Sequence, residues 1–414
     1  MIEADVWLSL ALYAGGRQTQ DIFRYFHSAE AVYDAGPSGR NNCGIFSPAQ
    51  LKRLNDPVWM CRAQKTVERC RELGVSVLPF SHPGYPNRLR EIDDPPWVLY
   101  VSGNMPNFDQ APALCIVGPR KATEYGLKCA YSLAARLALS GFIIVSGGAT
   151  GVDAAAHEGA LLHGGITCAV LGGGVLCEYP KENEALRAQI RRNGCLISEY
   201  PPDEPARKRN FLIRNRLMSA LSLGVILVEA PERSGSLNTV RHAVDQNRDV
   251  FVIPGNPGNP HYAGSNALLH DGAIPVYELG DILEEYLPFF GEKISPERAA
   301  AARLHPFAKA VPAPKTGGNR PKKEKSSPSV SEESRKQPVL QEKAVFSPEN
   351  KKILPESLSK NAKIVYNHLD KQEFSCDDLA STGLSVSEIM SALGELEIFG
   401  FISGIPGGFY TVCL

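Results

Sequence analysis

The spacing of apolar residues divides the chain into regions with different predicted structures. Over residues 1–80 they recur every three or four positions, as in DVWLSLALY and QDIFRYFHSAEAVYDAG, with glycines between the segments. This spacing is typical of amphipathic helices, so we predict a small helical domain of the helix-hairpin-helix or SAM-like kind there. A proline-rich connector at residues 83–103 then leads into a short strand.

From about residue 111 the pattern changes to short apolar runs separated by segments with helical spacing. Runs of valine, isoleucine and leucine between helices indicate a parallel sheet buried on both faces. We therefore predict an α/β fold, with a Rossmann-like, doubly wound and mostly parallel sheet in a domain at residues 81–290. Polar and glycine-rich residues follow the runs, at the strand ends where such sheets bind ligands. The runs are ALCIVG, FIIVSGG, ITCAVLGG, CLISEY, GVILVEA and DVFVIPG.

The remainder of the chain separates into two regions. Residues 291–359 are rich in Lys, Ser, Pro and Glu and poor in large apolar residues, which predicts a disordered linker. Residues 360–414 have the order of three helices and a hairpin, typical of a winged-helix domain. Winged helices usually bind DNA, but residues 374–414 contain carboxylates and no Lys, Arg or His. This charge disfavours phosphate binding and favours a protein contact or packing on its own chain.

Composition narrows the classes of function without selecting one. The net charge of -1 averages over the regions and indicates no partner. The ten cysteines contain no C-x-x-C pair, and several lie in apolar runs, which favours buried, reduced thiols over a zinc site or disulfides. The N-terminus MIEADVW lacks basic residues, and the longest apolar run is too short to cross a membrane. We expect a cytoplasmic protein without a metal site or membrane contact.

A glycine-rich loop after the second predicted strand is the first candidate site. It begins with Ser146, Gly147 and Gly148 and precedes a helix, so backbone N–H groups and the positive helix end could approach an anion. The next strand, however, ends in LGGG without the acidic residue that holds the ribose of a dinucleotide, and the chain lacks the G-K pair of a P-loop. We therefore predict no cofactor. A tight turn without a ligand stays the alternative.

Asp153 and His157 are candidates for a catalytic pair. They lie one helical turn apart, as a base and its orienting acid would. The chain lacks the G-x-S-x-G motif of a nucleophile elbow. We therefore favour structural roles, in which Asp153 braces the glycine loop and His157 bonds locally, and we predict no catalytic residue.

Basic residues follow several strands at the edge where the glycine loop is expected. Arginine can bind phosphate through two parallel hydrogen bonds and can stack on a base. With Tyr179 and Phe211 available for stacking, these residues predict a track for a single-stranded nucleic acid with exposed bases. They are Arg120 after the first strand, Lys181 after the third, and Arg207, Lys208, Arg209, Arg214 and Arg216 after the fourth.

Several ordered motifs resemble the bacterial DNA-processing protein A family (DprA, also called Smf). They include IVGPRKATEYG, SGGATGVDAAAHEGAL, LGGGVLCEYPKEN, ARKRNFLIRNR, VILVEAPERSGSLNTVRHAVDQNRDVFVIPGNP and GSNALLHDGA. The resemblance implies a protein without enzymatic activity that binds single-stranded DNA through its Rossmann-like domain and forms a homodimer through the same domain. It also implies a partner, the RecA recombinase, which members of the family load onto incoming DNA during natural transformation and recombination.

The resemblance also implies which residues bind DNA. Arg120, Lys181 and the loop Ser146–Gly148 match basic and glycine positions of the family's pocket, and Arg214 and Arg216 match its Arg-Asn-Arg. Two positions depart from the family pattern: Pro119 replaces a common Ser or Thr, and Leu176 replaces a usual Asp. Both are expected to line the pocket, so its detailed contacts are affected.

Two other classes of function stay open. One is an enzyme, a nucleoside-monophosphate phosphoribohydrolase on a related Rossmann-type fold. That group carries a P-G-G-x-G-T-x-x-E motif with a catalytic glutamate, and the nearest segments here, PERSGSLNTVRH and PGNPGNPHYAGSN, lack it. The other is a nucleotide-sensing scaffold that signals through its acidic winged helix.

Overall fold

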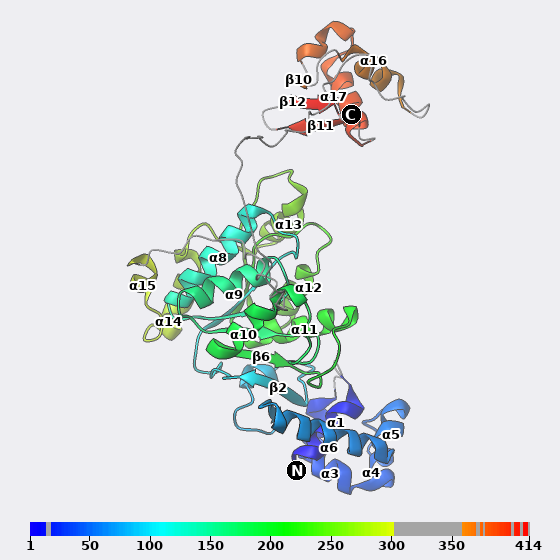
Figure 1. Cartoon of the computed structure of the whole chain (residues 1–414), viewed down its shortest axis with the longest axis vertical. Helices are drawn as coiled ribbons and strands as arrows, with labels where there is room; N and C mark the ends of the chain where they lie inside the picture. The colour runs from blue at the N-terminus through cyan, green and yellow to red at the C-terminus, as the bar shows by residue number, and fades with distance from the viewer. Residues whose placement is uncertain are drawn as a thin grey trace, which may run out of the picture. The chain divides into compact units, whose positions relative to one another are not determined.

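The chain folds into two compact units, Met1–Thr316 and Gly317–Leu414. The computed structural model describes residues 1–13, 18–301, 358–369, 373–375, 377–398, 401–405 and 409–412 (Figure 1). Most of the predicted linker, residues 302–357, lies outside the described residues. Its first part is ordered: helix α15 (Pro296–Ala301) packs on α8 (Glu124–Leu139), and Arg136 donates a hydrogen bond to the carbonyl of Ala299.

The N-terminal region is helical, as predicted. Ser47 and Gln50 form a capping box at the start of α5, and Asp56 caps α6, so local sequence fixes where these helices begin. The fully buried Trp7 on α1 lies in their shared core. The helices are α1 (Ile2–Leu12), α2 (Thr19–Phe26), α3 (Ala29–Asp34), α4 (Gly36–Asn42), α5 (Pro48–Leu54) and α6 (Pro57–Glu72).

A nine-stranded sheet forms the centre of the first unit, in the order β1-β2-β6-β5-β4-β3-β7-β8-β9. All six predicted strands are present and parallel, so the predicted doubly wound, mostly parallel fold is confirmed. The sequence analysis missed that β1 and β2 join the sheet as antiparallel strands, and it missed β9. The strands are β1 (Ser76–Pro79), β2 (Val98–Gly103), β3 (Ala113–Val117), β4 (Ile143–Ser146), β5 (Thr167–Val170), β6 (Gly194–Ser198), β7 (Gly224–Leu227), β8 (Asp249–Val252) and β9 (Ile274–Pro275).

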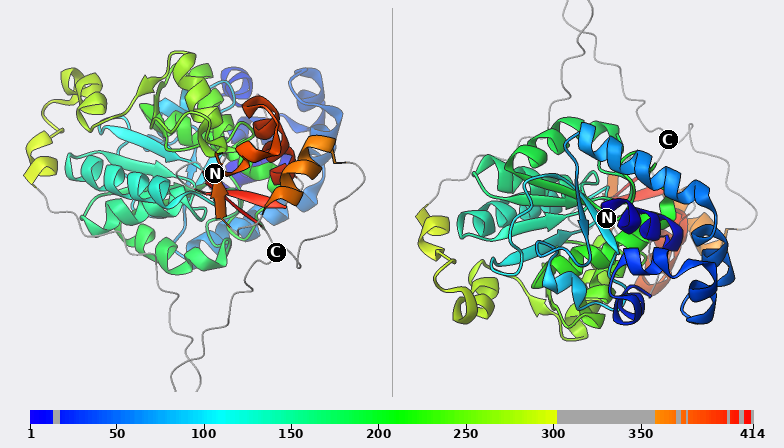
Figure 2. Two further views of the ribbon diagram at one scale, coloured as in Figure 1. Left: turned by 90° about the horizontal axis from the view of Figure 1, so that it is seen from above. Right: turned by 90° about the horizontal axis from the view of Figure 1, so that it is seen from below.

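Helices cover both faces of this sheet (Figure 2). Alternate strand residues point to opposite faces, so Ile116 of β3 packs against α8, α9 and α14 whereas Cys115 packs against α11 and α12. The remaining elements of this unit are α7 (Asn87–Arg90), α9 (Val152–Leu162), η1 (Lys181–Asn183), α10 (Glu184–Asn193), α11 (Lys208–Leu221), α12 (Ser236–Asp245), η2 (Pro260–Tyr262), α13 (Ala263–His270) and α14 (Gly280–Phe290).

Cysteines in the central strands are buried, as predicted. Cys115, Cys168 and Cys195 lie in β3, β5 and β6, and the Sγ atoms of Cys168 and Cys195 are 3.6 Å apart without a bond. Cys61 on α6 is exposed instead. None of the described helices combines the length and apolar character that a membrane-spanning segment needs.

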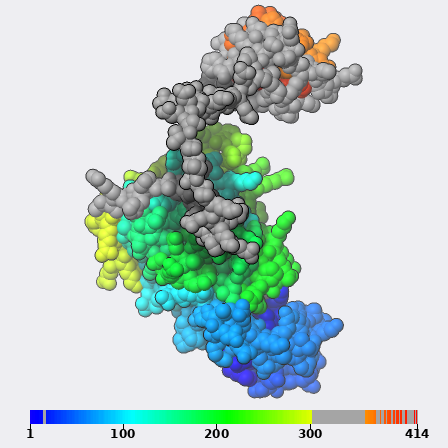
Figure 3. Space-filling model, viewed as in Figure 1, coloured from blue at the N-terminus to red at the C-terminus, as the bar shows by residue number. Residues whose placement is uncertain are grey.

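The N-terminal helices pack against the β1–β2 end of the sheet. Trp97, just before β2, donates a hydrogen bond of 2.9 Å from Nε1 to the buried carboxylate of Asp5 on α1. Arg69 on α6 pairs with Asp203 in the loop after β6, with 3.3 Å between Nε and Oδ2. The surface of these helices, in blue, therefore continues into that of the sheet region (Figure 3).

The C-terminal unit has the predicted order of helices and a hairpin. Its elements are α16 (Lys360–His368), β10 (Glu373–Ser375), η4 (Asp377–Thr382), α17 (Val386–Ile398), β11 (Ile402–Ile405) and β12 (Phe409–Val412). The second predicted helix is the short 3-10 helix η4, and β10 was not predicted; it completes a sheet in the order β10-β12-β11. The predicted Pro-Gly-Gly turn of the hairpin, residues 406–408, lies outside the described residues.

Candidate nucleic-acid interface

A cleft of about 330 Å³ opens where the winding of the sheet reverses direction. The strand β3 has β4 on one side and β7 on the other, and the chain proceeds outward from it in both directions. Connections on the two sides of such a switch point leave a crevice beyond the carboxyl ends of the strands. The cleft is lined by residues 118–120 after β3, Ala149 in the glycine loop, the first turns of α11, and residues 231 and 233–236 after β7.

Three side chains converge at this edge from three separate connections between strands, with Phe211 in the first turn of α11. The guanidinium carbon of the exposed Arg120 lies 4.8 Å from the centre of the Phe211 ring and 5.8 Å from that of Tyr179. Its Nη1 donates to the Tyr179 hydroxyl at 2.8 Å, and the two ring centres are 5.5 Å apart. A cation beside two aromatic rings at the mouth of a cleft can meet both a phosphate and a base. The predicted proximity of these residues is confirmed.

Lys181 lies two residues after Tyr179 in the sequence. It begins the 3-10 helix η1 and is exposed. The next residues are held against the glycine loop, because the buried Asn183 donates from Nδ2 to the carbonyls of both Gly148 and Ala149 at 3.0 Å. The segment that carries Lys181 is therefore fixed beside the loop.

The glycine loop is tied to its surroundings by hydrogen bonds and is turned partly inward. Ser146 is buried, and its hydroxyl donates to the carbonyl of Ile116 in β3 at 2.7 Å, so this side chain is bonded within the sheet. The assignment of Ser146 to a DNA-binding loop stays a prediction. Gly148 has a φ of +67°, which favours glycine. A Cβ on Gly147 would lie 2.5 Å from Nη1 of Arg214 and 2.6 Å from Oδ2 of Asp153. The loop thus needs glycine at 147 to admit these two side chains.

Asp153 occupies the position where an anion could approach the loop. Its Oδ2 accepts a hydrogen bond from the N–H of Ala149 at 3.3 Å, at the start of α9. Burial raises the pKa of this carboxyl above its usual value, and the Arg214 guanidinium opposes the shift. Asp153 is therefore the internal brace that the sequence indicated.

Arg214 lies beneath the cleft and is buried. Its Nη1 donates to the carbonyl of Gly147 at 2.9 Å and also to that of Val170 at the end of β5. It reaches the inner wall of the cleft with only 4% of its surface exposed. Arg214 therefore holds the loop in place and contributes positive charge from below, instead of gripping a ligand at the surface.

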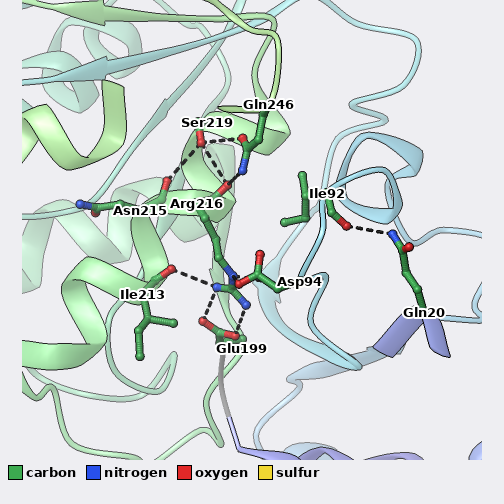
Figure 4. Close-up of polar contacts among 9 residues, drawn as sticks. All are labelled: Gln20, Ile92, Asp94, Glu199, Ile213, Asn215, Arg216, Ser219 and Gln246. Carbon is green, nitrogen blue, oxygen red and sulfur yellow. Dashed lines mark hydrogen bonds and ion pairs between the residues drawn. The ribbon is translucent and has the colours of Figure 1, made fainter. Parts of the chain in front are cut away.

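Arg216 does not belong to this site, which corrects the assignment made from its Arg-Asn-Arg motif. Figure 4 shows its guanidinium bound to both oxygens of Glu199 at 2.8 Å, with Asp94 at 2.9 Å from Nε. Its side chain is 3% exposed. Burial alone would lower the pKa of Arg216, but Glu199 and Asp94 raise it above its usual value. The motif therefore pairs one arginine near the cleft with one that stabilises the fold.

The structure adds cleft residues that the sequence analysis did not assign. Arg233 and Ser234 come from the loop after β7, and Asn215 and Thr239 come from α11 and α12. Arg233 is exposed and adds a second positive charge to the lining of the cleft, beside that of Arg120. The sequence analysis could have found Arg233, because the segment EAPERSGS follows an apolar run at the same edge of the sheet. No motif distinguished this arginine from an ordinary surface residue.

The two positions that depart from the family pattern lie in different parts of the structure. Pro119 lines the cleft, as expected. Leu176 packs instead against the apolar cluster shared with the N-terminal helices, and its N–H donates to the carbonyl of Pro202. The replacement at 119 therefore affects the cleft, whereas the replacement at 176 affects packing.

Candidate catalytic groups near the strand ends have structural contacts. His157 is fully buried, its Nδ1 is 2.7 Å from the hydroxyl of Thr167, and burial lowers its pKa to about 3. The imidazole is therefore neutral at physiological pH, as its predicted local role requires. The buried Glu229 after β7 accepts hydrogen bonds from Thr123 and from the hydroxyl of Tyr262. Among the described residues, no cluster of His, Cys, Asp and Glu could hold a metal ion.

Comparisons with known proteins agree on one family. The model of the DNA recombination-mediator protein A family matches residues 76–287, and that of the DprA winged helix domain matches residues 349–408. The predicted winged helix is thereby confirmed. Protein Smf from Synechocystis is 33% identical over 396 residues, which are 93% of this chain and 92% of that protein. The DNA processing protein DprA from Bacillus subtilis is 38% identical over 52% of this chain and 72% of that protein.

Solved structures give the same relationship. The X-ray structure of DNA processing protein A from Streptococcus pneumoniae superposes with a TM-score of 0.61 and 30% identity. The match covers 69% of this chain and 98% of that one. The nine-stranded sheet region therefore has a relative of known structure.

The burial of Arg216 predicts a large loss of stability when it is replaced. In Arg216→Met, Glu199 and Asp94 lose their shared cation, so the free energy of unfolding should fall by roughly 3–5 kcal/mol. Urea denaturation followed by circular dichroism measures this change. The control is Arg207→Met, which removes an exposed pair with Glu204 and should cost less than about 1 kcal/mol. An equal decrease in the free energy of unfolding in the two variants would show that the buried ion pair stabilises the fold no more than the pair of Arg207 with Glu204 does.

Proposed function

The chain belongs to the DNA recombination-mediator protein A family, whose relatives carry the names DprA and Smf, and we propose that it binds single-stranded DNA along the carboxyl edge of its sheet. The proposal rests above all on Arg120, an exposed guanidinium beside the rings of Tyr179 and Phe211. Cations that track phosphates and aromatic rings that stack on bases are the two components of such sites.

The same components explain why a single strand would be preferred and its sequence ignored. In a duplex the base faces are stacked on one another, so Phe211 and Tyr179 could not reach them. Arg120 and Arg233 are exposed on loops that line the cleft, and Lys181 is exposed at the start of η1, so all three can neutralise phosphates. Phosphate contacts and stacking carry little sequence information.

We propose that this binding is the protein's activity, without a chemical step. The acidic side chain that lines the cleft, Asp153, is committed to the glycine loop. The imidazole of His157 is buried and neutral, and Glu229 is bonded to Thr123 and Tyr262. These groups lack the access to a substrate that a general acid or base requires.

From the family we propose that the protein's partner is the RecA recombinase, loaded onto single-stranded DNA during natural transformation and recombination in the cytoplasm. We further propose a homodimer formed through the sheet region. Two copies would place two binding edges on one strand and raise the effective affinity of each.

The proposal predicts selective and salt-sensitive binding. The whole protein should bind fluorescent oligo-dT more tightly than a duplex of equal length, and the affinity should fall steeply with salt because phosphate neutralisation dominates. Fluorescence anisotropy at several salt concentrations measures both effects. Equal affinity for the two substrates, or no binding at low salt, would refute the proposal.

Two substitutions test the position of the site. Arg120→Ala and Lys181→Ala should each weaken oligo-dT binding and lower the salt slope by about 0.7, the value for one phosphate contact on a single strand. Both residues are exposed, so the thermal melting temperature should not change. Lys128→Ala, on the exposed face of α8, is the matched control. Normal binding by both site variants would place the site elsewhere.

The acidic character of the winged helix predicts that it is dispensable for DNA affinity. Residues 374–414 carry no cation, and the lysines of the removed segment 360–414, Lys360, Lys363 and Lys371, are outnumbered by its carboxylates, so the Kd for oligo-dT should change by less than about threefold. The same anisotropy assay on the truncated and whole chains measures this. A large loss of affinity would mean that the winged helix contacts DNA despite its charge.

A further inference from the structure

A second groove, outside the cleft, lies between the N-terminal helices and the sheet region. Its volume is about 330 Å³. One wall is the exposed face of α6, with Arg62, Lys65 and Arg69 at the spacing of successive helical turns. The opposite wall is the loop Pro201–Glu204, which follows β6. No residue that lines this groove also lines the cleft.

The charges in the groove leave an excess of cations. Both carboxylates are already paired: Asp203 binds Arg69 at 3.3 Å, and Glu204 binds Arg207 at 3.1 Å. Arg62 and Lys65 make no ion pair with any other described residue. A ligand that enters the groove therefore meets two positive charges without counter-ions.

An aromatic ring accompanies these cations. The guanidinium of Arg62 lies 4.6 Å from the centre of the half-buried Trp59 ring, and that of Arg53 lies 5.9 Å from it on α5. Arg120 has the same relation to Phe211 and Tyr179 in the cleft. Arg62, which lines the groove, thus repeats beside Trp59 the pairing of guanidinium and ring that suits a nucleic-acid strand.

The chain itself connects the groove to the cleft. Pro201–Glu204 walls the groove, and Ala206 lines a narrow slot together with Tyr179 and Phe211. Phe211 also lines the cleft. Lys208 and Arg209, both exposed, begin α11 between these points. Basic residues therefore occur along the whole path from one site to the other.

We propose that a single strand held at the cleft continues over the start of α11 into this groove, where Arg62 and Lys65 bind its phosphates. The N-terminal helices then supply a second DNA-binding segment on the same strand. This inference rests on the proposed binding of single-stranded DNA. If the proposal holds, the affinity should continue to increase with strand length after the strand is long enough to fill the cleft.

The test compares oligo-dT lengths from about 6 to about 30 nucleotides, which bracket common site sizes. In the whole chain, Arg62→Gln combined with Lys65→Gln should bind the shortest oligomers like the wild type. With long oligomers it should bind roughly fivefold to tenfold more weakly, with a salt slope lower by about 1.4, which is two contacts at roughly 0.7 each. The charge-preserving pair Arg62→Lys and Lys65→Arg should keep the wild-type behaviour.

A control pair removes equal charge elsewhere: Arg71→Gln, on the opposite side of α6, with Lys128→Gln on α8. It should bind every length like the wild type. If the Arg62/Lys65 variant matches the wild type at all lengths, the groove proposal is overturned while binding at the cleft stands. If the wild type binds no oligomer, the proposed function itself fails. If the Arg62/Lys65 variant also bound the shortest oligomers more weakly, the groove would not be a separate second binding segment, and the proposal would fail.

Discussion

The shared direction of the central strands is the constraint on which the binding edge depends. Because β6, β5, β4, β3, β7 and β8 are parallel, the loops that follow them all open on one edge. Helices cover both faces of the sheet, so polar groups can gather only at its edges. Arg120, Tyr179 and Phe211 come from three separate connections and still meet within 6 Å.

This constraint is also why much of the fold could be predicted. Each central strand is a continuous apolar run, and any arginine that follows such a run lies at the common edge. The strands that were missed are short and lack that signal: β1 ends in Pro79, and β9 has only two residues. Their place in the sheet depends on pairing with strands far along the chain, which no local pattern records.

The two arginines of α11 show where sequence reasoning ends. Arg214 and Arg216 are two positions apart on one helix, so they point in different directions. Arg214 reaches the glycine loop, whereas Arg216 finds Glu199 and Asp94. A basic residue near a strand end is equally compatible with a ligand or a buried ion pair. Only the tertiary position of the carboxylates separates the two, and Asp94 lies in the proline-rich connector, outside the motifs quoted above.

The carboxylate of Asp153 has a consequence for what the edge can select. The Ala149 N–H of the glycine loop already donates to the Asp153 side chain. A free mononucleotide, which offers few phosphates, would find that donor taken and would have to rely on one or two surface cations. A polymer loses only one contact among many. The number of contacts would therefore distinguish a polymer from a mononucleotide. Free nucleotides would bind this edge only weakly, although no element of the site recognises and rejects them.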